Sequence, residues 1–148
     1  KSDIVGSTDI LLVVNRLHEL YGKENVTLAD LDGLDFIVRE KGSHTREIFA
    51  LEMEKNNIHW NPAWSCHNTQ AIKNAVDAGL GIGVLSKLSV RRRLQSGRFW
   101  ELRPFEEPLS LHLRIAYRKN QYFPKALGDF KTFMIQQFRL MDMEGYRR

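Results

Sequence analysis

The sequence has 148 residues, of which 43% are hydrophobic and 27% are charged, and it carries a formal net charge of +4. This composition is ordinary for a globular protein and argues against a disordered chain. No apolar run approaches the length that spans a bilayer, and no secretory signal pattern is present. The single cysteine, Cys66, excludes an internal disulfide framework and is compatible with a reducing cytoplasm. Because the first residue is Lys1 rather than Met, we expect a piece of a longer protein.

Hydrophobic patterning predicts the elements of the first part of the chain. Residues 1–7 show no clear pattern, whereas the apolar run Asp9–Arg16 predicts a strand that is buried on both faces. A short helix is expected to open with Thr27 as its N-cap and to end at Gly33. The next predicted elements are a strand at 34–38, a helix at 45–55 and a strand at 63–67.

The clearest helix of the sequence follows Asn68, which is expected to cap it. Its apolar residues recur at i, i+3, i+4 and i+7 from Ile72 to Gly79. Gly81 and Gly83 then allow tight packing against neighbouring helices. The remaining predicted elements are a strand at 82–85, a helix capped by Ser86 that runs through Leu94, a weak strand at 99–102, a strand at 109–117, and a helix that opens at Pro124 and frays from Met141 to Arg148.

Strands and helices alternate between residues 34 and 102, which predicts right-handed crossovers and a parallel sheet covered on both faces. In open α/β sheets, ligands bind beyond the carboxyl ends of the strands. Those ends are expected at 40–45, 66–69 and 85–86, and the first two carry small polar residues. The fold argument therefore indicates a ligand site at this edge of the sheet.

The turn Gly42–Arg46 is the centre of the predicted site. It leads from a buried strand into a helix whose first N–H groups and positive dipole end favour an anion. Arg46 offers a fork for a carboxylate. In the alternative interpretation, Ser43 only caps the helix and Arg46 is solvated or paired with Glu40 or Glu47. The residues predicted to contact a ligand are Ser43, His44, Thr45, Arg46, Cys66, His67, Asn68 and Thr69.

The sequence gives no sign of catalysis. We find no nucleophile with a paired base, no carboxylate dyad and no phosphate loop, and no cofactor is expected. His44 and His67 are more simply polar residues at strand ends than metal ligands, because no HxxxH or CxxC spacing appears. The run Arg91-Arg92-Arg93 fits either a nucleic-acid surface or a solvated helix face, and the solvated face is the simpler interpretation.

Two motifs resemble the effector domains of LysR-type transcriptional regulators. The segment Ala71–Ser86, AIKNAVDAGLGIGVLS, resembles the IKxAVxAGLGIGxLP segment of that family, with Ser86 in place of the usual Pro. The turn GSHTR at Gly42–Arg46 resembles the family's GSxTR turn. The resemblance extends over about Asp9 to Phe138, which is nearly the whole chain.

The resemblance implies an α/β fold, Rossmann-like with a parallel sheet flanked by helices, of the type 2 periplasmic-binding-protein kind. Residues 17–107 would be a complete second effector-binding subdomain. Residues 1–16 and 108–148 would be the remaining part of the first subdomain and the C-terminal helix. We then expect exposed apolar surface on the strand at 109–117 and on the helix at 130–138.

The same resemblance implies a function. The chain would be the ligand-sensing domain of a bacterial LysR-type regulator that is not an enzyme. It would bind a small effector, expected to be an anion, between two lobes. DNA would be bound through a helix-turn-helix domain absent from this chain, in a cytoplasmic homodimer or homotetramer. The alternative is a solute-binding protein of a transport system with the same fold.

Overall fold

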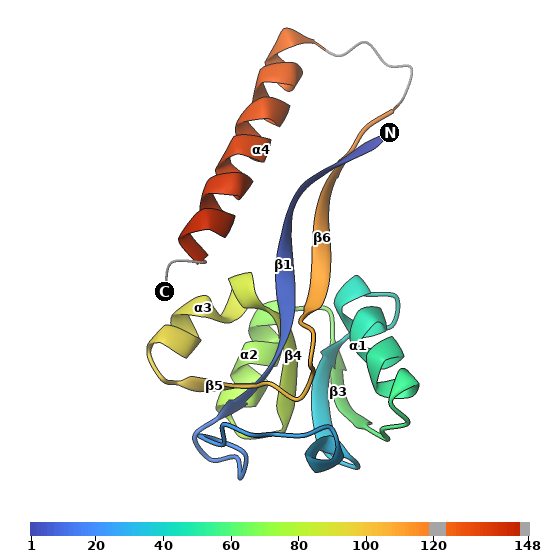
Figure 1. The fold of residues 1–148 in the computed structure, drawn as a ribbon, viewed down its shortest axis with the longest axis vertical. Helices are drawn as coiled ribbons and strands as arrows, with labels where there is room; N and C mark the ends of the chain where they lie inside the picture. Colours follow the sequence, from blue (N-terminus) through green and yellow to red (C-terminus); the bar gives the residue numbers. More distant parts are fainter. Residues whose placement is uncertain (119–123, 146–148) are drawn as a thin grey trace. The chain divides into compact units, whose positions relative to one another are not determined.

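The computed structural model describes residues 1–118 and 124–145, with the side chains of the last helix up to Phe138. Figure 1 shows the elements in the colours of the sequence. In chain order they are β1 (Ser2–Asn15), the 3₁₀ turn η1 (Ala29–Leu31), β2 (Asp35–Arg39), α1 (His44–Lys55), β3 (Asn61–Cys66), α2 (Thr69–Asp77), β4 (Ile82–Ser86), α3 (Lys87–Gln95), β5 (Phe99–Leu102), β6 (Leu109–Ala116) and α4 (Lys125–Gly145). None of the described helices is long and apolar enough to cross a membrane.

The chain divides into two compact units. Unit 1 contains Lys1–Thr8 and residues from His112 onward, and unit 2 contains Asp9–Leu111. Strands β1 and β6 contribute residues to both units, and β6 pairs with β1. The assignment of 17–107 to a second subdomain, and of 1–16 and 108–148 to a first, stays a prediction.

The sheet of unit 2 has the strand order β3-β2-β4-β1-β5. Strand β2 is parallel to both β3 and β4, whereas β1 is antiparallel to both β4 and β5. Strands β2 to β5 therefore run in one direction, as their alternation with helices predicts. The parallel sheet predicted from residues 34–102 is confirmed, and β1, which precedes that alternation, joins it as an antiparallel strand. No helical crossover leads into β1, so the crossover rule does not set its direction.

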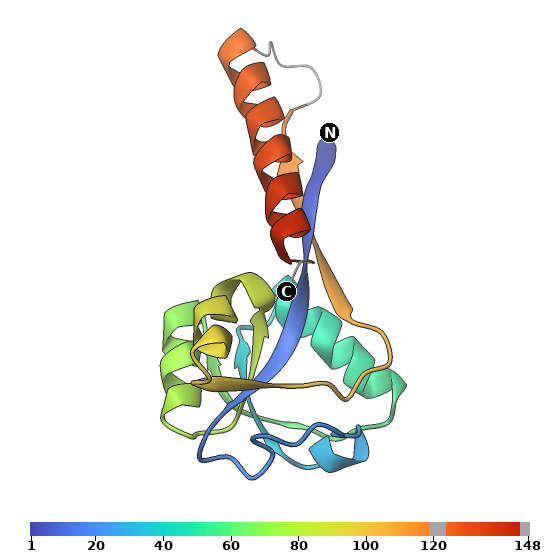
Figure 2. The ribbon, with the colours of Figure 1, turned by 60° about the vertical axis from the view of Figure 1, so that its left-hand side comes forward.

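Strand β1 is the centre of the hydrophobic core, and its side chains alternate between two clusters. Leu12 and Val14 belong to one cluster with Phe49 and Met53 of α1, while Leu11 and Val13 belong to the other with residues of α2 and α3. Successive residues of a strand point to opposite faces, so a continuous apolar run fills the core on both sides. Figure 2 shows α1 on one side of the sheet and α2 and α3 on the other. The prediction of a strand buried on both faces is confirmed.

The helix starts follow the predicted residues, but the capping differs. Asn68 Oδ1 accepts hydrogen bonds from the N–H groups of Gln70 (2.7 Å) and Ala71 (3.3 Å), which confirms Asn68 as the N-cap of α2. Ser86 is the N-cap residue of α3, as predicted, but its side chain makes no capping hydrogen bond. The expected helix after Thr27 is only the 3₁₀ turn η1. Thr27 Oγ1 accepts a hydrogen bond of 3.4 Å from the Asp30 N–H.

Unit 1 is built from the start of β1, the end of β6, and α4. The N-terminal ammonium of Lys1 donates to the Tyr117 carbonyl at 2.8 Å, and the Tyr117 N–H donates to the Lys1 carbonyl at 2.9 Å. Residues 2–7 are thus a strand although their sequence shows no pattern, because pairing with a distant strand orders them. Helix α4 continues through Gly145 and is not frayed from Met141; residues 146–148 lie outside the described residues.

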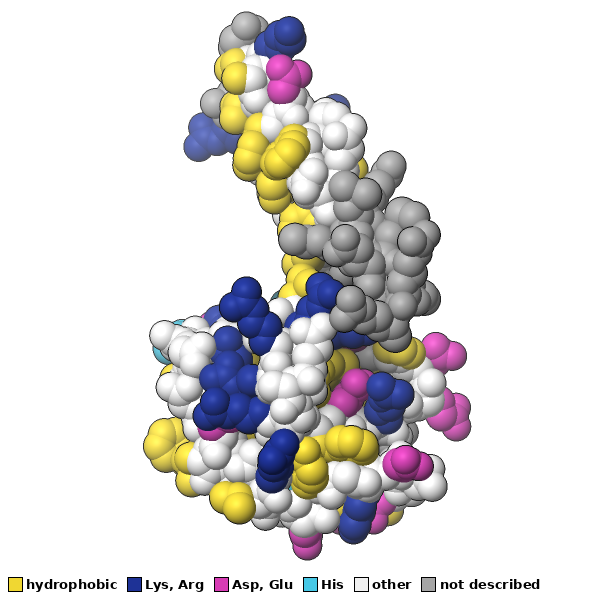
Figure 3. Space-filling model, turned by 90° about the vertical axis from the view of Figure 1, so that its left-hand side faces the viewer, with side chains coloured by type: hydrophobic (Ala, Val, Ile, Leu, Met, Phe, Trp, Pro, Cys, Tyr) yellow, Lys and Arg dark blue, Asp and Glu magenta, His cyan; other side chains and the backbone are white. Residues whose placement is uncertain are grey.

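Large apolar side chains are exposed on α4, as expected for this helix. Leu127, Phe130 and Phe133 are each about half exposed. Figure 3 shows apolar side chains, in yellow, on the surface of unit 1. On β6 the apolar side chains are less exposed: Leu109 is buried and Leu111 is half-buried. The expected exposure is therefore confirmed for the helix and is weaker for the strand.

Candidate functional site

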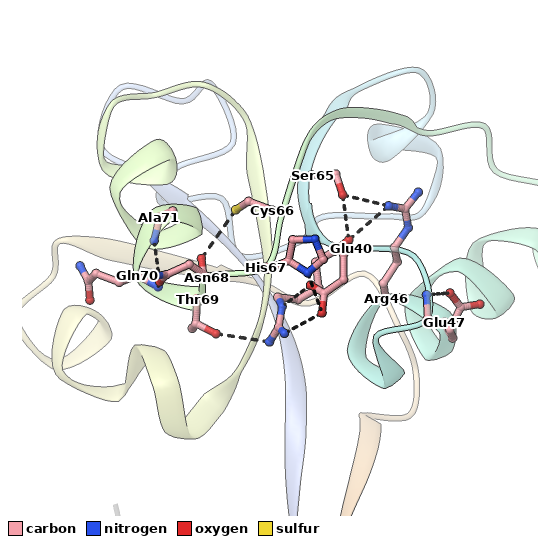
Figure 4. Close-up of polar contacts among 12 residues, drawn as sticks. Glu40, Arg46, Glu47, Ser65, Cys66, His67, Asn68, Thr69, Gln70 and Ala71 are labelled. Carbon is pink, nitrogen blue, oxygen red and sulfur yellow. Dashed lines mark hydrogen bonds and ion pairs between the residues drawn. The ribbon is translucent and has the colours of Figure 1, made fainter.

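The predicted site lies at the carboxyl ends of β2 and β3, where α1 and α2 begin. Arg39, the last residue of β2, is in register with Cys66, the last residue of β3. The turns that follow these residues therefore meet at one edge of the sheet. Figure 4 shows the polar contacts that connect them.

An Arg–Glu pair occupies the middle of this edge. Arg39 donates from Nε to Glu40 Oε2 at 2.8 Å and from Nη2 to Glu40 Oε1 at 2.9 Å, which is a bidentate pair. Its Nη1 donates to Thr69 Oγ1 at 3.5 Å. His67 Nδ1 lies 3.6 Å from Glu40 Oε1. The pair thus links the end of β2 to the first turn of α2 and to the residue that follows β3.

The pair changes the acid–base behaviour of both partners. The hydrogen bonds from Arg39 are the main cause that lowers the pKa of Glu40 from 4.5 to about 2. The hydrogen bond to Glu40 is likewise the main cause that raises the pKa of Arg39. The charged form of each side chain is therefore favoured by the other.

The lowered pKa of Glu40 predicts an acid-dependent loss of stability. Because its folded-state pKa lies below the unfolded value, ionised Glu40 stabilises the fold fully above about pH 4.5, and this stabilisation is lost as the pH falls through about 2. We expect Glu40→Gln to show a shallower decline of the free energy of unfolding over this window in urea titrations. Glu54→Gln, which changes an exposed carboxylate of α1, is the control and should follow the wild type. Parallel curves for wild type and Glu40→Gln would contradict the prediction.

Arg46 connects α1 to β2 and β3. Its Nη1 donates to the Arg39 carbonyl and to Ser65 Oγ, both at 3.2 Å, and its guanidinium lies 5.8 Å from the centre of the Trp60 ring. Among the described ion pairs it joins neither Glu40, which pairs with Arg39, nor Glu47, whose carboxylate accepts from the Gly42 N–H at 3.0 Å. Arg46 is therefore a half-buried cross-link that uses one of its donor nitrogens within the protein.

The N-terminus of α1 differs from that of α2. Ser43 is the N-cap of α1 but makes no side-chain capping bond. Within the described residues, the backbone N–H groups of His44, Thr45 and Arg46 have no hydrogen-bond acceptor. The first turn of α2 is instead satisfied by Asn68. Of the two helices at this edge, α1 is therefore the one whose first turn presents donors to a ligand.

Cys66 and Asn68 have local structural contacts. Cys66 is half-buried, and its Sγ lies 3.6 Å from the Asn68 carbonyl oxygen, to which it donates. The side chain of Asn68 caps α2. The predicted residues thus form two groups: Cys66, His67, Asn68 and Thr69 lie around the Arg39–Glu40 pair and the start of α2, while Ser43, His44 and Thr45 open α1.

Sequence reasoning missed Arg39 and named Glu40 only as a partner for Arg46. The available signal was their position directly after the apolar residues Phe36–Val38, at the carboxyl end of a predicted strand. Arg39 also contacts the first turn of α2 through its side chain, which donates to Thr69, and the first turn of α1 through its carbonyl, which accepts from Arg46. The contact between them depends on strand register, which the local sequence does not specify.

Two hollows in the described part of unit 2 lie away from this edge, with volumes of about 530 and 410 Å³. They are found where α1, α2 and α3 end rather than where they begin. The first is lined by Asn15, Arg16, Leu17, Asp77, Ser96 and Arg98, and the second by Glu54, Asn57, Ile58, His59 and Trp60. Neither of these two hollows contains a predicted site residue.

A comparison with known protein families identifies the family to which these motifs belong. The model of the LysR substrate-binding domain matches residues 2–139. The chain belongs to the LysR substrate-binding domain family. This confirms the resemblance seen in the GSHTR turn and the AGLGIG block. Curated relatives of this LysR domain are transcriptional regulators and not enzymes, as predicted.

Individual relatives support the assignment. The HTH-type transcriptional regulator YeiE of Escherichia coli K12 is 39% identical over 111 residues, which are 73% of this chain and 37% of that protein. The regulatory domain of Synechocystis PCC6803 CcmR, solved with 2-PG, has a TM-score of 0.83 at 22% identity over 93% of this chain and 66% of that one. The effector-binding domain of QuiR, solved with shikimate, has a TM-score of 0.79 at 20% identity over 94% of this chain and 65% of that one.

These structural likenesses confirm the predicted α/β fold of the periplasmic-binding-protein type. At such identities they show the fold alone. The LysR domain spans between 26% and 44% of the length of the curated relatives it matches.

Proposed function

We propose that this LysR domain senses a small anionic effector, which binds at the first turn of α1 beside the start of α2. The observation that carries the proposal is the first turn of α1, where three consecutive backbone N–H groups have no acceptor in the described chain. The hydroxyl groups of Ser43 and Thr45 stand in the same turn, and both residues are half-buried. Helix N-termini with such donors favour carboxylate, phosphate or sulfate groups.

The solved relatives are consistent with this ligand class. CcmR was solved with 2-PG and QuiR with shikimate, and shikimate is a carboxylate. We carry over to this chain only the class of ligand, a small organic anion. Binding of the effector between two lobes stays a prediction.

The output of the sensor follows from the family. We propose a bacterial transcriptional regulator that binds DNA through a helix-turn-helix domain outside this chain and acts in the cytoplasm as a homodimer or homotetramer. An effector changes the regulator only through its differential affinity for two conformations. The alternative, a solute-binding protein, is disfavoured because the curated relatives are transcriptional regulators. A winged-helix pattern encoded upstream would support the regulator, and a signal peptide there would favour transport.

A ligand screen tests the anion site. Thermal shifts of the chain should be measured with carboxylates, sulfate and phosphate at constant ionic strength. We expect Thr45→Ala and Arg46→Ala to reduce the anion-induced shift relative to the melting temperature of each variant without ligand. Thr45→Ala removes a hydroxyl donor, and Arg46→Ala removes the cross-link that fixes α1 to the ends of β2 and β3.

Matched controls keep this test specific. Thr132→Ala replaces an exposed threonine of α4, and Arg92→Ala replaces an exposed arginine of α3. Both should keep the wild-type shift. If Thr45→Ala and Arg46→Ala leave every anion-induced shift unchanged, the proposed site is wrong.

A further inference from the structure

We propose that Arg39 forms a carboxylate subsite of this LysR domain, and that Glu40 fills it as an internal competitor which the effector must displace. The inference deepens the proposed function and rests on it. It names the chemical group that is recognised, a planar carboxylate. It also names Glu40 as the side chain that occupies the subsite when no effector is bound and thereby lowers the affinity for the effector.

The geometry of the pair supports a ligand subsite. Arg39 presents Nε and Nη2 side by side, and the two Glu40 oxygens accept at 2.8 and 2.9 Å. This fork is the arrangement that recognises any carboxylate in a bidentate manner. An effector carboxylate in the place of the Glu40 carboxylate would make the same two hydrogen bonds. The Nη1 contact to Thr69 Oγ1 holds the guanidinium at the start of α2 during such an exchange.

The exchange is open to solvent and needs little rearrangement. The side chains of Arg39 and Glu40 are 29% and 24% exposed, so a ligand reaches the pair without unfolding of the edge. Glu40 lies in the turn between β2 and α1, outside both elements. His67 Nδ1, 3.6 Å from Glu40 Oε1, offers the displaced carboxylate a second partner when the imidazole is protonated. One Arg–carboxylate pair replaces another, so charge pairing is conserved.

An ordinary surface ion pair is the competing interpretation, and such pairs contribute little. Two observations favour a ligand role. The pair stands at the carboxyl ends of the strands, where α/β sheets bind ligands, and it contacts Thr69 in the first turn of α2. The neighbouring first turn of α1 supplies further donors that Glu40 does not use. The ion pair therefore adjoins the unsatisfied donors of the proposed anion site.

The test is an NMR titration of the chain with sodium acetate at constant ionic strength. The Arg39 Nε–H resonance and the amides of 44–46 report on the two parts of the site. We expect Glu40→Gln to bind acetate about tenfold more tightly than the wild type, because the internal carboxylate no longer competes. Without the Arg39 guanidinium this gain in acetate affinity should be absent, so Arg39→Gln should bind acetate no more tightly than the wild type. Glu54→Gln, which removes the same charge from an exposed position on α1, should stay within about twofold of the wild type.

The outcomes separate the subsite from the proposed function. If acetate shifts the amides of 44–46 but Glu40→Gln binds no more tightly than the wild type, the competitor role is overturned and the anion site stands. If acetate shifts none of these resonances in any variant, the anion site itself is wrong. Glu40→Ala repeats the measurement with the side chain removed. Loss of the folded spectrum in both Glu40 variants would show that the pair is structural and would also overturn the proposal.

Discussion

Replacement of Phe36 by alanine is expected to lower the free energy of unfolding by about 3–5 kcal/mol. Phe36 lies in β2 and is completely buried. Its ring centre is 5.1 Å from that of Phe49 and 5.9 Å from that of Trp60. The substitution removes both ring contacts and leaves a cavity between β2 and α1. Denaturant unfolding followed by circular dichroism measures the loss.

An aromatic residue of the neighbouring strand is the control. Trp64 lies in the edge strand β3, with 55% of its surface exposed. Trp64→Ala should change the free energy of unfolding by less than about 1 kcal/mol, because little buried surface is lost. Equal losses for the two variants would show that α1 does not pack on β2 as described. In addition, Phe36→Ala should weaken anion binding, since α1 carries the first turn of the proposed site.

Replacement of Gly83 by alanine is expected to destabilise the LysR domain by about 1–3 kcal/mol through overpacking. A Cβ atom at this position would lie 2.5 Å from Val76 Cγ2 of α2 and 3.3 Å from Val13 Cγ2 of β1. Since Val13 and Val76 are fully buried, neither has free space to move into. The same denaturant unfolding experiment measures the effect.

A double-mutant cycle identifies the cause of that loss. Val76→Ala removes the methyl group that meets the new Cβ, so the pair Gly83→Ala with Val76→Ala should be less destabilised than the sum of the single changes. Strict additivity would contradict the close approach of α2 to β4. Gly128→Ala is the control, because nothing lies within 4 Å of a Cβ there. In the first turn of α4 it should stabilise the helix by no more than about 0.5–1 kcal/mol.

The glycines of the AGLGIG block show how far local sequence reasoning reaches. The sequence predicts that Gly81 and Gly83 allow close packing against helices. For Gly83 this is right, because its close neighbour Val76 belongs to α2. For Gly81 the neighbour is instead the Asp35 carbonyl oxygen of β2, which would lie 2.7 Å from a Cβ atom at this position, and the φ angle is +146°. A glycine is required at both positions, but only the sheet pairing explains the second.

The kind of fold and the family could be predicted from the amino-acid sequence alone. Alternating apolar runs and helix starts such as Asn68 act within a few residues, so they are readable in order along the chain. The same holds for the motifs at Gly42–Arg46 and Ala71–Ser86, which indicated a LysR domain. The predicted site residues near α1 and α2 came from these local signals and from the rule that ligands bind at the carboxyl ends of strands.

The direction of β1 and the contacts between side chains at the site could not be predicted in this way and are known from the three-dimensional structure. Strand β1 is antiparallel between β4 and β5, and its first residues pair with β6, more than a hundred positions away. The Arg39 guanidinium reaches Thr69, and Arg46 reaches Ser65, across strand pairs that no local pattern specifies. Such contacts depend on strand order and register, which arise when distant segments compete to bury the same apolar surface. For that reason the sequence predicts the edge of the sheet at which a ligand binds, whereas the Arg39–Glu40 pair at this edge is seen only in the structure.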